Sequence, residues 1–149
     1  MAMSRERQQG KVTGLAADLW PSRDPGRSVA LLKALHILTR DGALNADSRR
    51  KLKQVLHLVQ LLRPPLEALL AETEEPAIAD LGAGKSYLGF ILYDLILGPA
   101  GRGRVHGVEE RTELVEASRL LAGESGFARL EFLAGRIADA ELPGRRADM

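Results

Sequence analysis

The sequence of 149 residues contains no cysteine. Without cysteine the chain can form neither a disulfide framework nor a thiolate metal site. Its three histidines, His36, His57 and His106, are too far apart in the sequence to predict a zinc cluster. We therefore expect no metal site, and the absence of disulfides fits the reducing environment of the cytoplasm.

Long apolar runs are also missing. The longest one, Tyr87–Leu97, is far shorter than the roughly 20 residues that a membrane-spanning helix needs. Residues 1–10 are polar and charged, with no apolar segment behind them, so the sequence predicts neither a secretory signal nor a membrane anchor. A hydrophobic content of 45% is nevertheless sufficient for one folded core.

The net charge of +1 conceals a division between two regions. Residues 1–65 carry 12 Lys and Arg against 5 Asp and Glu, whereas residues 66–149 carry 9 against 15. We interpret the chain as a basic helical region, residues 1–75, followed by an α/β region, residues 76–149, that is incomplete at its C-terminal end.

Apolar residues at helical spacing predict two amphipathic helices in the basic region. The first covers residues 28–40 and is stopped by Asp41-Gly42, and the second covers residues 46–63. Because proline lacks an N–H donor and restricts the residue before it, Pro64-Pro65 predicts a kink or a break before a short continuation to Glu72.

The second region has a β-α-β-α-β pattern. The predicted strands are 77–81, 104–108 and 130–134, and the predicted helices are 86–97 and 112–122. Gly98-Pro99 and Gly123 mark the expected ends of these helices. Alternating strands and helices predict an α/β fold with a parallel sheet covered by helices.

The first predicted strand leads into a turn with two glycines, Gly82 and Gly84. Glycine permits a sharp turn and a close approach of a ligand to the main chain, and the N–H groups of the following helix point at the same place. A phosphate-binding P-loop would require glycine at Ala79, and a dinucleotide fingerprint would require it at Tyr87. S-adenosylmethionine (SAM), which carries no phosphate, tolerates both departures.

The segments Asp80–Tyr93 and His106–Glu109 resemble the first two cofactor motifs of class I SAM-dependent methyltransferases. They are similar to the subgroup whose glycine turn continues as Gly-Lys-Ser-Tyr-Leu-x-Phe and whose core follows an N-terminal helical extension. This resemblance, over residues 28–149, implies a Rossmann-like sheet, SAM as the cofactor and methyl transfer as the activity.

The resemblance also implies residue roles. Asp80 would lie near the amino group of SAM, and Glu109 would accept hydrogen bonds from both ribose hydroxyls. The acid expected after the third strand is replaced by Arg136, so Ile137, Asp139 or backbone groups are left as candidates for the adenine contact. The candidate cofactor-binding residues are Asp80, Gly82, Ala83, Gly84, Tyr87, Glu109, Glu110, Arg136 and Ile137.

Several of these residues also have a purely structural interpretation. Asp80 and Glu109 are each placed to cap the helix that follows, and Tyr87 is placed to pack at a helix start. His106 fits a core or edge position within its strand.

A basic cluster, Arg49, Arg50, Lys51 and Lys53, is the sequence feature that points to a partner. Positive charge in the first turns of a helix opposes the helix dipole, so RNA phosphates are one candidate for its purpose. The alternative is a solvated charged face.

The last residues, 146–149, look like the start of a fourth strand, which in the family lies beside the first and carries substrate and catalytic residues. We therefore expect the catalytic residues beyond Met149, weak SAM affinity and no turnover in the isolated chain. The open edge at residues 77–81 predicts self-association.

The methyl acceptor is not identified by the sequence, and RNA, protein and small molecules all stay open. Two other functions are kept as alternatives: a non-catalytic module that binds RNA or protein, and a fragment of an NAD-dependent oxidoreductase.

Overall fold

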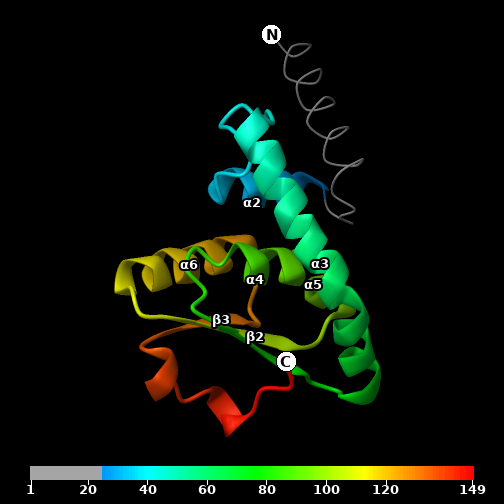
Figure 1. Ribbon diagram of the computed structural model, residues 1–149, viewed down its shortest axis with the longest axis vertical. Coiled ribbons are helices and arrows are strands. Elements are labelled where there is room, and N and C mark those ends of the chain that lie inside the picture. The colour runs from blue at the N-terminus through cyan, green and yellow to red at the C-terminus, as the bar shows by residue number, and fades with distance from the viewer. Residues whose placement is uncertain (1–24) are drawn as a thin grey trace. The chain divides into compact units, whose positions relative to one another are not determined.

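The computed structural model describes residues 25–149 (Figure 1). The chain divides into two compact units, the first ending at Gln54 and the second running from Val55 to Met149. The boundary between residues 75 and 76, which rests on composition, stays a prediction. The part of the predicted helical region that precedes residue 25 lies outside the described residues.

The first helix of the described chain, α2 (Pro25–Ala34), is shorter than the predicted residues 28–40. It ends because His36 adopts a left-handed conformation, with φ of 57°. The N–H of His36 then donates to the Lys33 carbonyl at 3.0 Å, and the N–H of Ile37 donates to the Leu32 carbonyl at 2.9 Å. This is a Schellman closure, and the apolar residues beyond Ala34 belong to it rather than to the helix.

The long helix α3 (Ala46–Glu72) begins where the Asn45 side chain accepts a hydrogen bond from the Ser48 N–H at 2.8 Å. It continues through Pro64 and Pro65, so a break there is wrong, and a kink at the two prolines stays a prediction. The two prolines remove only their own N–H donors, and burial of the neighbouring Leu66 supports the helix on their C-terminal side. No helix within residues 25–149 is long and apolar enough to cross a membrane.

The second unit contains the sheet. Strands β1 (Ala77–Leu81), β2 (Arg104–Glu109) and β3 (Leu130–Ala134) pair in parallel in the order β1-β2-β3. The registers place Leu81 beside Val108 and Glu109 beside Ala134. The predicted α/β fold with three parallel strands is confirmed, and the carboxyl ends of all three strands meet at one edge.

The helical segment after β1 extends further than predicted. Helix α4 (Tyr87–Leu92) passes into a π-helical turn (Tyr93–Leu97) and then into α5 (Gly98–Ala100). Gly98 therefore does not end the segment: its N–H donates to the Tyr93 carbonyl, and a Cβ at this position would lie only 2.8 Å from that oxygen. Glycine is needed at this wide turn because any side chain would collide with the backbone.

The next helix, α6 (Thr112–Ser125), also ends later than predicted, at Gly126 rather than at Gly123. Gly126 has the left-handed φ of 71° that closes a helix, whereas Gly123 lies within it. In Figure 1, α4 and α6 cover one face of the sheet, and the segment after β3, with its turns Ile137–Asp139 and Pro143–Arg145, runs along the other.

Aromatic rings fill the space between the helices and the sheet. Phe90 of α4 lies 5.7 Å from the ring of Phe132 on β3, and Tyr93 lies 4.5 Å from Phe127. The guanidinium carbon of Arg129 lies over the Tyr93 ring, 5.0 Å from its centroid. These contacts fix α4, and hence the glycine turn before it, against the sheet.

The outer edge of β1 is partly occupied. The N–H of Asp148 donates to the Ala77 carbonyl at 2.6 Å, and the N–H of Ala79 donates to the Met149 carbonyl at 2.8 Å. Met149 thus lies beside β1, where the sequence predicts the start of a fourth strand. The self-association predicted for residues 77–81 stays a prediction, and these bonds leave only the end of β1 available for it.

Candidate functional site

The turn between β1 and α4 is held at the carboxyl end of β2. Three of its residues, Gly82, Gly84 and Ser86, have positive φ values of 74°, 59° and 63°. The N–H groups of Gly82 and Ala83 both donate to the Val108 carbonyl, at 2.8 and 2.9 Å. The glycines accept this conformation without strain, whereas it costs a residue such as Ser86 about 1–2 kcal/mol. The turn is therefore a constrained structure attached to β2.

Glu109, the last residue of β2, completes this attachment. Its Oε2 accepts a hydrogen bond from the Gly84 N–H at 2.7 Å. Its Oε1 accepts from Arg111, from the side-chain Nε at 3.0 Å and from the backbone N–H at 3.3 Å. Sequence reasoning missed Arg111, and the signal for it was a cation two residues after an acid at a strand end. The glycine turn and the acid are thus in direct contact.

These contacts keep the Glu109 carboxylate ionised. The hydrogen bond from the Arg111 side chain, followed by those from the Gly84 and Arg111 N–H groups, lowers its pKa from 4.5 to about 2. Within residues 25–149 the helix cap that the structural interpretation gives Glu109 is not formed, because Arg111 stands at the N-cap of α6 and no side-chain cap hydrogen bond is present there. The bond to Gly84 instead joins the end of β2 to the turn that follows β1.

The lowered pKa predicts a pH dependence of stability. Because the folded pKa lies below the ordinary value, the stabilisation by Glu109 is fully present above pH 4.5 and is lost as the pH falls from 4.5 towards 2. Urea unfolding at several pH values should show this loss in the wild type and not in Glu109→Gln. Equal slopes for the two proteins over this window would contradict the prediction.

Asp80, the other predicted acid, lies half-buried on β1 against the start of α4. Its Oδ2 is 3.7 Å from the point where a Cβ on Gly89 would stand. Within residues 25–149 its carboxylate makes no hydrogen bond, so the predicted cap of α4 is not formed, and burial raises its pKa. A bound cation would therefore stabilise the ionised form of this carboxylate.

An apolar rim borders the turn. Ile137, from the segment after β3, places its Cδ1 3.7 Å from the Cβ position of Gly82, and its side chain is 54% exposed. Leu81, at the end of β1, is 51% exposed. Two exposed large apolar side chains beside an anchored carboxylate give this edge of the sheet both an apolar and a hydrogen-bonding component.

The other candidates are placed less specifically. Tyr87 is half-buried as the first residue of α4. Glu110 and Arg136 are exposed, and within the described chain their side chains make no hydrogen bond or ion pair. Asp139 is also exposed, and only its backbone N–H bonds, to the Arg136 carbonyl at 3.1 Å. The structure thus brings the glycines, Glu109 and Ile137 together and leaves these residues at the periphery.

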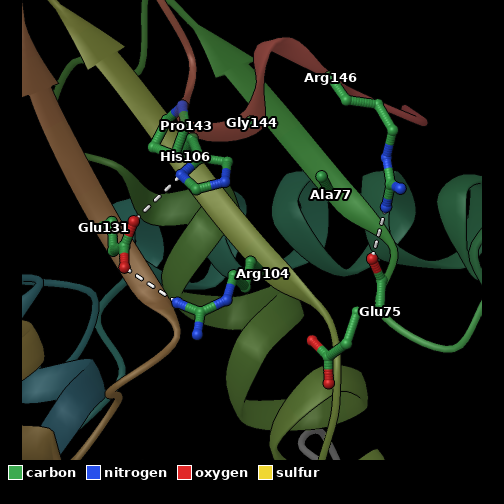
Figure 2. A pocket seen from close by; sticks show the side chains of 8 residues that line it. All are labelled: Glu75, Ala77, Arg104, His106, Glu131, Pro143, Gly144 and Arg146. Carbon is green, nitrogen blue, oxygen red and sulfur yellow. Dashed lines mark hydrogen bonds and ion pairs between the residues drawn. The ribbon is translucent and has the colours of Figure 1, made fainter.

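A pocket of about 340 Å³ lies near the amino-terminal ends of the strands (Figure 2). His106, on β2, is buried there, with Nδ1 3.3 Å from Glu131 Oε2 but in no hydrogen bond. The charged groups around it pair with one another: Arg104 with Glu131 at 3.0 Å, and Arg146 with Asp148 at 3.1 Å. Because ligands of open α/β sheets bind at the carboxyl ends of the strands, the glycine turn and not this pocket is the candidate cofactor site.

Comparisons with known proteins assign the family. The sequence model of a family described as a methyltransferase domain matches residues 50–148, which include the glycine turn and Glu109. No curated protein matches the sequence significantly.

Within residues 25–149, no group of three or more His, Asp or Glu side chains could hold a metal ion.

Two solved structures resemble parts of the chain. YcgJ from Bacillus subtilis is 23% identical over 46% of this chain, with a TM-score of 0.38, and a mutant form of MtNAS is 22% identical over 75%, with a TM-score of 0.46. The chain spans 27% and 40% of the length of these two proteins. Because the family model matches two thirds of its length, this chain belongs to the methyltransferase-domain family, and the predicted resemblance to class I SAM-dependent methyltransferases is confirmed.

Proposed function

We propose that this chain binds SAM at the carboxyl ends of β1 and β2 and forms the cofactor-binding part of a methyltransferase. The observation that carries the proposal is the contact between Glu109 and Gly84, 2.7 Å from Oε2 to the backbone nitrogen. It fixes an ionised carboxylate beside a turn whose glycines leave the main chain open to a ligand.

The chemistry of SAM fits the groups at this edge. Its ribose offers two hydroxyl donors, which suit a carboxylate with two acceptor oxygens at Glu109. Its amino group is positive and suits the half-buried carboxylate of Asp80. Its adenine is a flat ring with an apolar face and suits the exposed side chain of Ile137. Tyr87, Glu110 and Arg136 are proposed only as neighbours of the bound cofactor.

Methyl transfer requires an acceptor held in line with the methyl group and the sulfur, in some cases with a base beside it. Among residues 25–149 no group with this role is identified, and the methyl acceptor stays unidentified. We therefore propose that the isolated chain binds SAM weakly and does not turn over.

Isothermal titration calorimetry with S-adenosylhomocysteine and with NAD⁺ tests the proposal. We expect saturable heat from S-adenosylhomocysteine and none from NAD⁺, because Tyr87 stands where a dinucleotide site needs its third glycine. Binding of NAD⁺ alone would support the oxidoreductase alternative. Binding of neither ligand at millimolar concentration would support the non-catalytic module.

The basic cluster favours RNA as a partner. Arg49, Arg50 and Lys53 are exposed and form no ion pair within the described chain, whereas Lys51 pairs with Asp47 at 3.1 Å. Positive charges near the start of α3 are unfavourable for the helix dipole, and RNA phosphates would compensate the three that have no ion pair among residues 25–149. We propose that these three residues contact RNA and that Lys51 contributes little.

Replacing Arg49, Arg50 and Lys53 by alanine should weaken RNA binding and flatten its salt dependence. Each phosphate contact to a single strand contributes about 0.7 to the slope of log affinity against log salt concentration, so the slope should fall by about 2. Fluorescence anisotropy with a single-stranded RNA at several salt concentrations measures this, with Lys51→Ala as the control. Unchanged affinity and slope in the triple variant would rule out the contact.

A further inference from the structure

The hydrogen bonds at Glu109 leave too few acceptor positions for a ribose. An ionised carboxylate has about four lone-pair positions. Three donors already use them: the Gly84 N–H on Oε2, and the side-chain Nε and the backbone N–H of Arg111 on Oε1. One position is left, while a ribose presents two neighbouring hydroxyl donors.

Of the three donors, only the Arg111 side chain can leave at low cost. The two backbone N–H groups belong to the constrained turn and to the start of α6. The Arg111 side chain is 61% exposed, whereas the side chain of Glu109 is 10% exposed. Exposed ion pairs of this kind contribute little stability because water replaces them readily.

The Arg111 guanidinium also extends across the glycine turn. Its Nη2 lies 3.8 Å from the point where a Cβ on Gly84 would stand. The guanidinium therefore stands over the same carboxylate and the same glycine that a ligand would approach. A second acid is at hand when it moves away, since Glu113 attracts Arg111 electrostatically.

We propose that Arg111 is a specificity-determining residue. In the unliganded chain its guanidinium occupies an acceptor position on the Glu109 carboxylate, which we call the closed form of the site, and only a ligand with two neighbouring hydroxyls displaces it. A ribose diol replaces the Arg111 Nε–H bond and fills the remaining acceptor position. A ligand with one hydroxyl fills the remaining position without moving Arg111. This inference rests on the proposed function, and it concerns how the same site selects its ligand.

Displacement of the Arg111 guanidinium costs free energy, and only the diol has to displace it. Because the diol binds only the open form of the site, its apparent affinity is the intrinsic affinity multiplied by the fraction of molecules that are open. In Arg111→Ala every molecule is open, so S-adenosylhomocysteine should bind about 2- to 5-fold more tightly, the range given by an exposed ion pair. The affinity for its 2′-deoxy analogue should stay the same within error.

Calorimetry of the wild type, Arg111→Ala and the control Arg145→Ala with both ligands tests the proposal. Arg145 is exposed, and within the described chain its side chain makes no hydrogen bond or ion pair. A gain for S-adenosylhomocysteine alone, absent in the control, supports the role of Arg111. If the wild type binds but Arg111→Ala gains nothing, or gains equally for both ligands, the role of Arg111 is overturned and the proposed function stands.

A measurement without ligand separates the two claims further. Carboxyl resonances followed by NMR in the unliganded chain should show a higher pKa for Glu109 in Arg111→Ala than in the wild type. An unchanged pKa would show that Arg111 does not occupy the Glu109 carboxylate, and it would overturn the proposal even if S-adenosylhomocysteine binds. A raised pKa with no binding to either protein shows that the closure forms but overturns the SAM site, and with it the selection of a diol.

Discussion

Replacing Glu109 with alanine should weaken the binding of S-adenosylhomocysteine about 10- to 100-fold. The carboxylate is the proposed acceptor of both ribose hydroxyls, and without it the hydroxyls lose a charged hydrogen-bond partner, a loss that corresponds to about 10- to 100-fold in affinity. Part of this is offset because Arg111 no longer competes for the site. The dissociation constant from calorimetry, compared between the variant and the wild type, gives the effect.

Glu116→Ala is the matched control for this experiment. Glu116 is an exposed acid on α6, in the same charge class, and in the described chain its side chain makes no hydrogen bond or ion pair. Its replacement should leave the affinity unchanged. If the Glu109→Ala protein is folded by circular dichroism and binds S-adenosylhomocysteine as tightly as the wild type, Glu109 does not take part in binding.

Replacing Gly107 with alanine should lower the free energy of unfolding by about 1–3 kcal/mol. Gly107 lies in the middle of β2, and a Cβ there would stand 2.7 Å from Cδ1 of Phe132 and 3.4 Å from Cβ of Ala83. The Phe132 ring is buried and packs against Phe90, so it cannot move away without disturbing the aromatic core. Urea unfolding of the two proteins measures the difference.

The same substitution at Gly123 should not lower the free energy of unfolding. Gly123 lies within α6, and a Cβ there would meet no atom within 4 Å. Alanine is favoured over glycine in a helix by about 0.5–1 kcal/mol, so Gly123→Ala should be as stable as the wild type or more so. If both variants were destabilised equally, the packing explanation at Gly107 would fail.

The sequence predicted the sheet well because the strand signals are local. The three runs at residues 77–81, 104–108 and 130–134 are short, apolar and bounded by turn residues, and the structure confirms them as parallel strands. Helix ends were predicted poorly, because they depend on backbone conformation. Gly126 closes α6 and Gly123 does not, although both are glycines near the same end. His36 closes α2 from a left-handed conformation that composition gives no reason to expect.

The candidate site was predicted in outline but not in its details. Strand ends and glycine spacing brought Gly84 and Glu109 together, and the 2.7 Å bond between them agrees with that grouping. The spacing of Arg111 two residues after Glu109 shows that the two are neighbours in the sequence but not that they bond, since the Arg111 side chain is exposed and its position depends on how the chain leaves β2. The helix cap considered for Asp80 is also not formed, because Ser86, six residues further along the chain, stands at the N-cap of α4.

A crystal structure of the chain with S-adenosylhomocysteine tests the central claim most directly. We expect density for the ligand over the glycine turn, both ribose hydroxyls within hydrogen-bonding distance of the Glu109 carboxylate, and the Arg111 side chain turned away from it. A ligand bound elsewhere on the chain, with Arg111 still bonded to Glu109, would contradict the account.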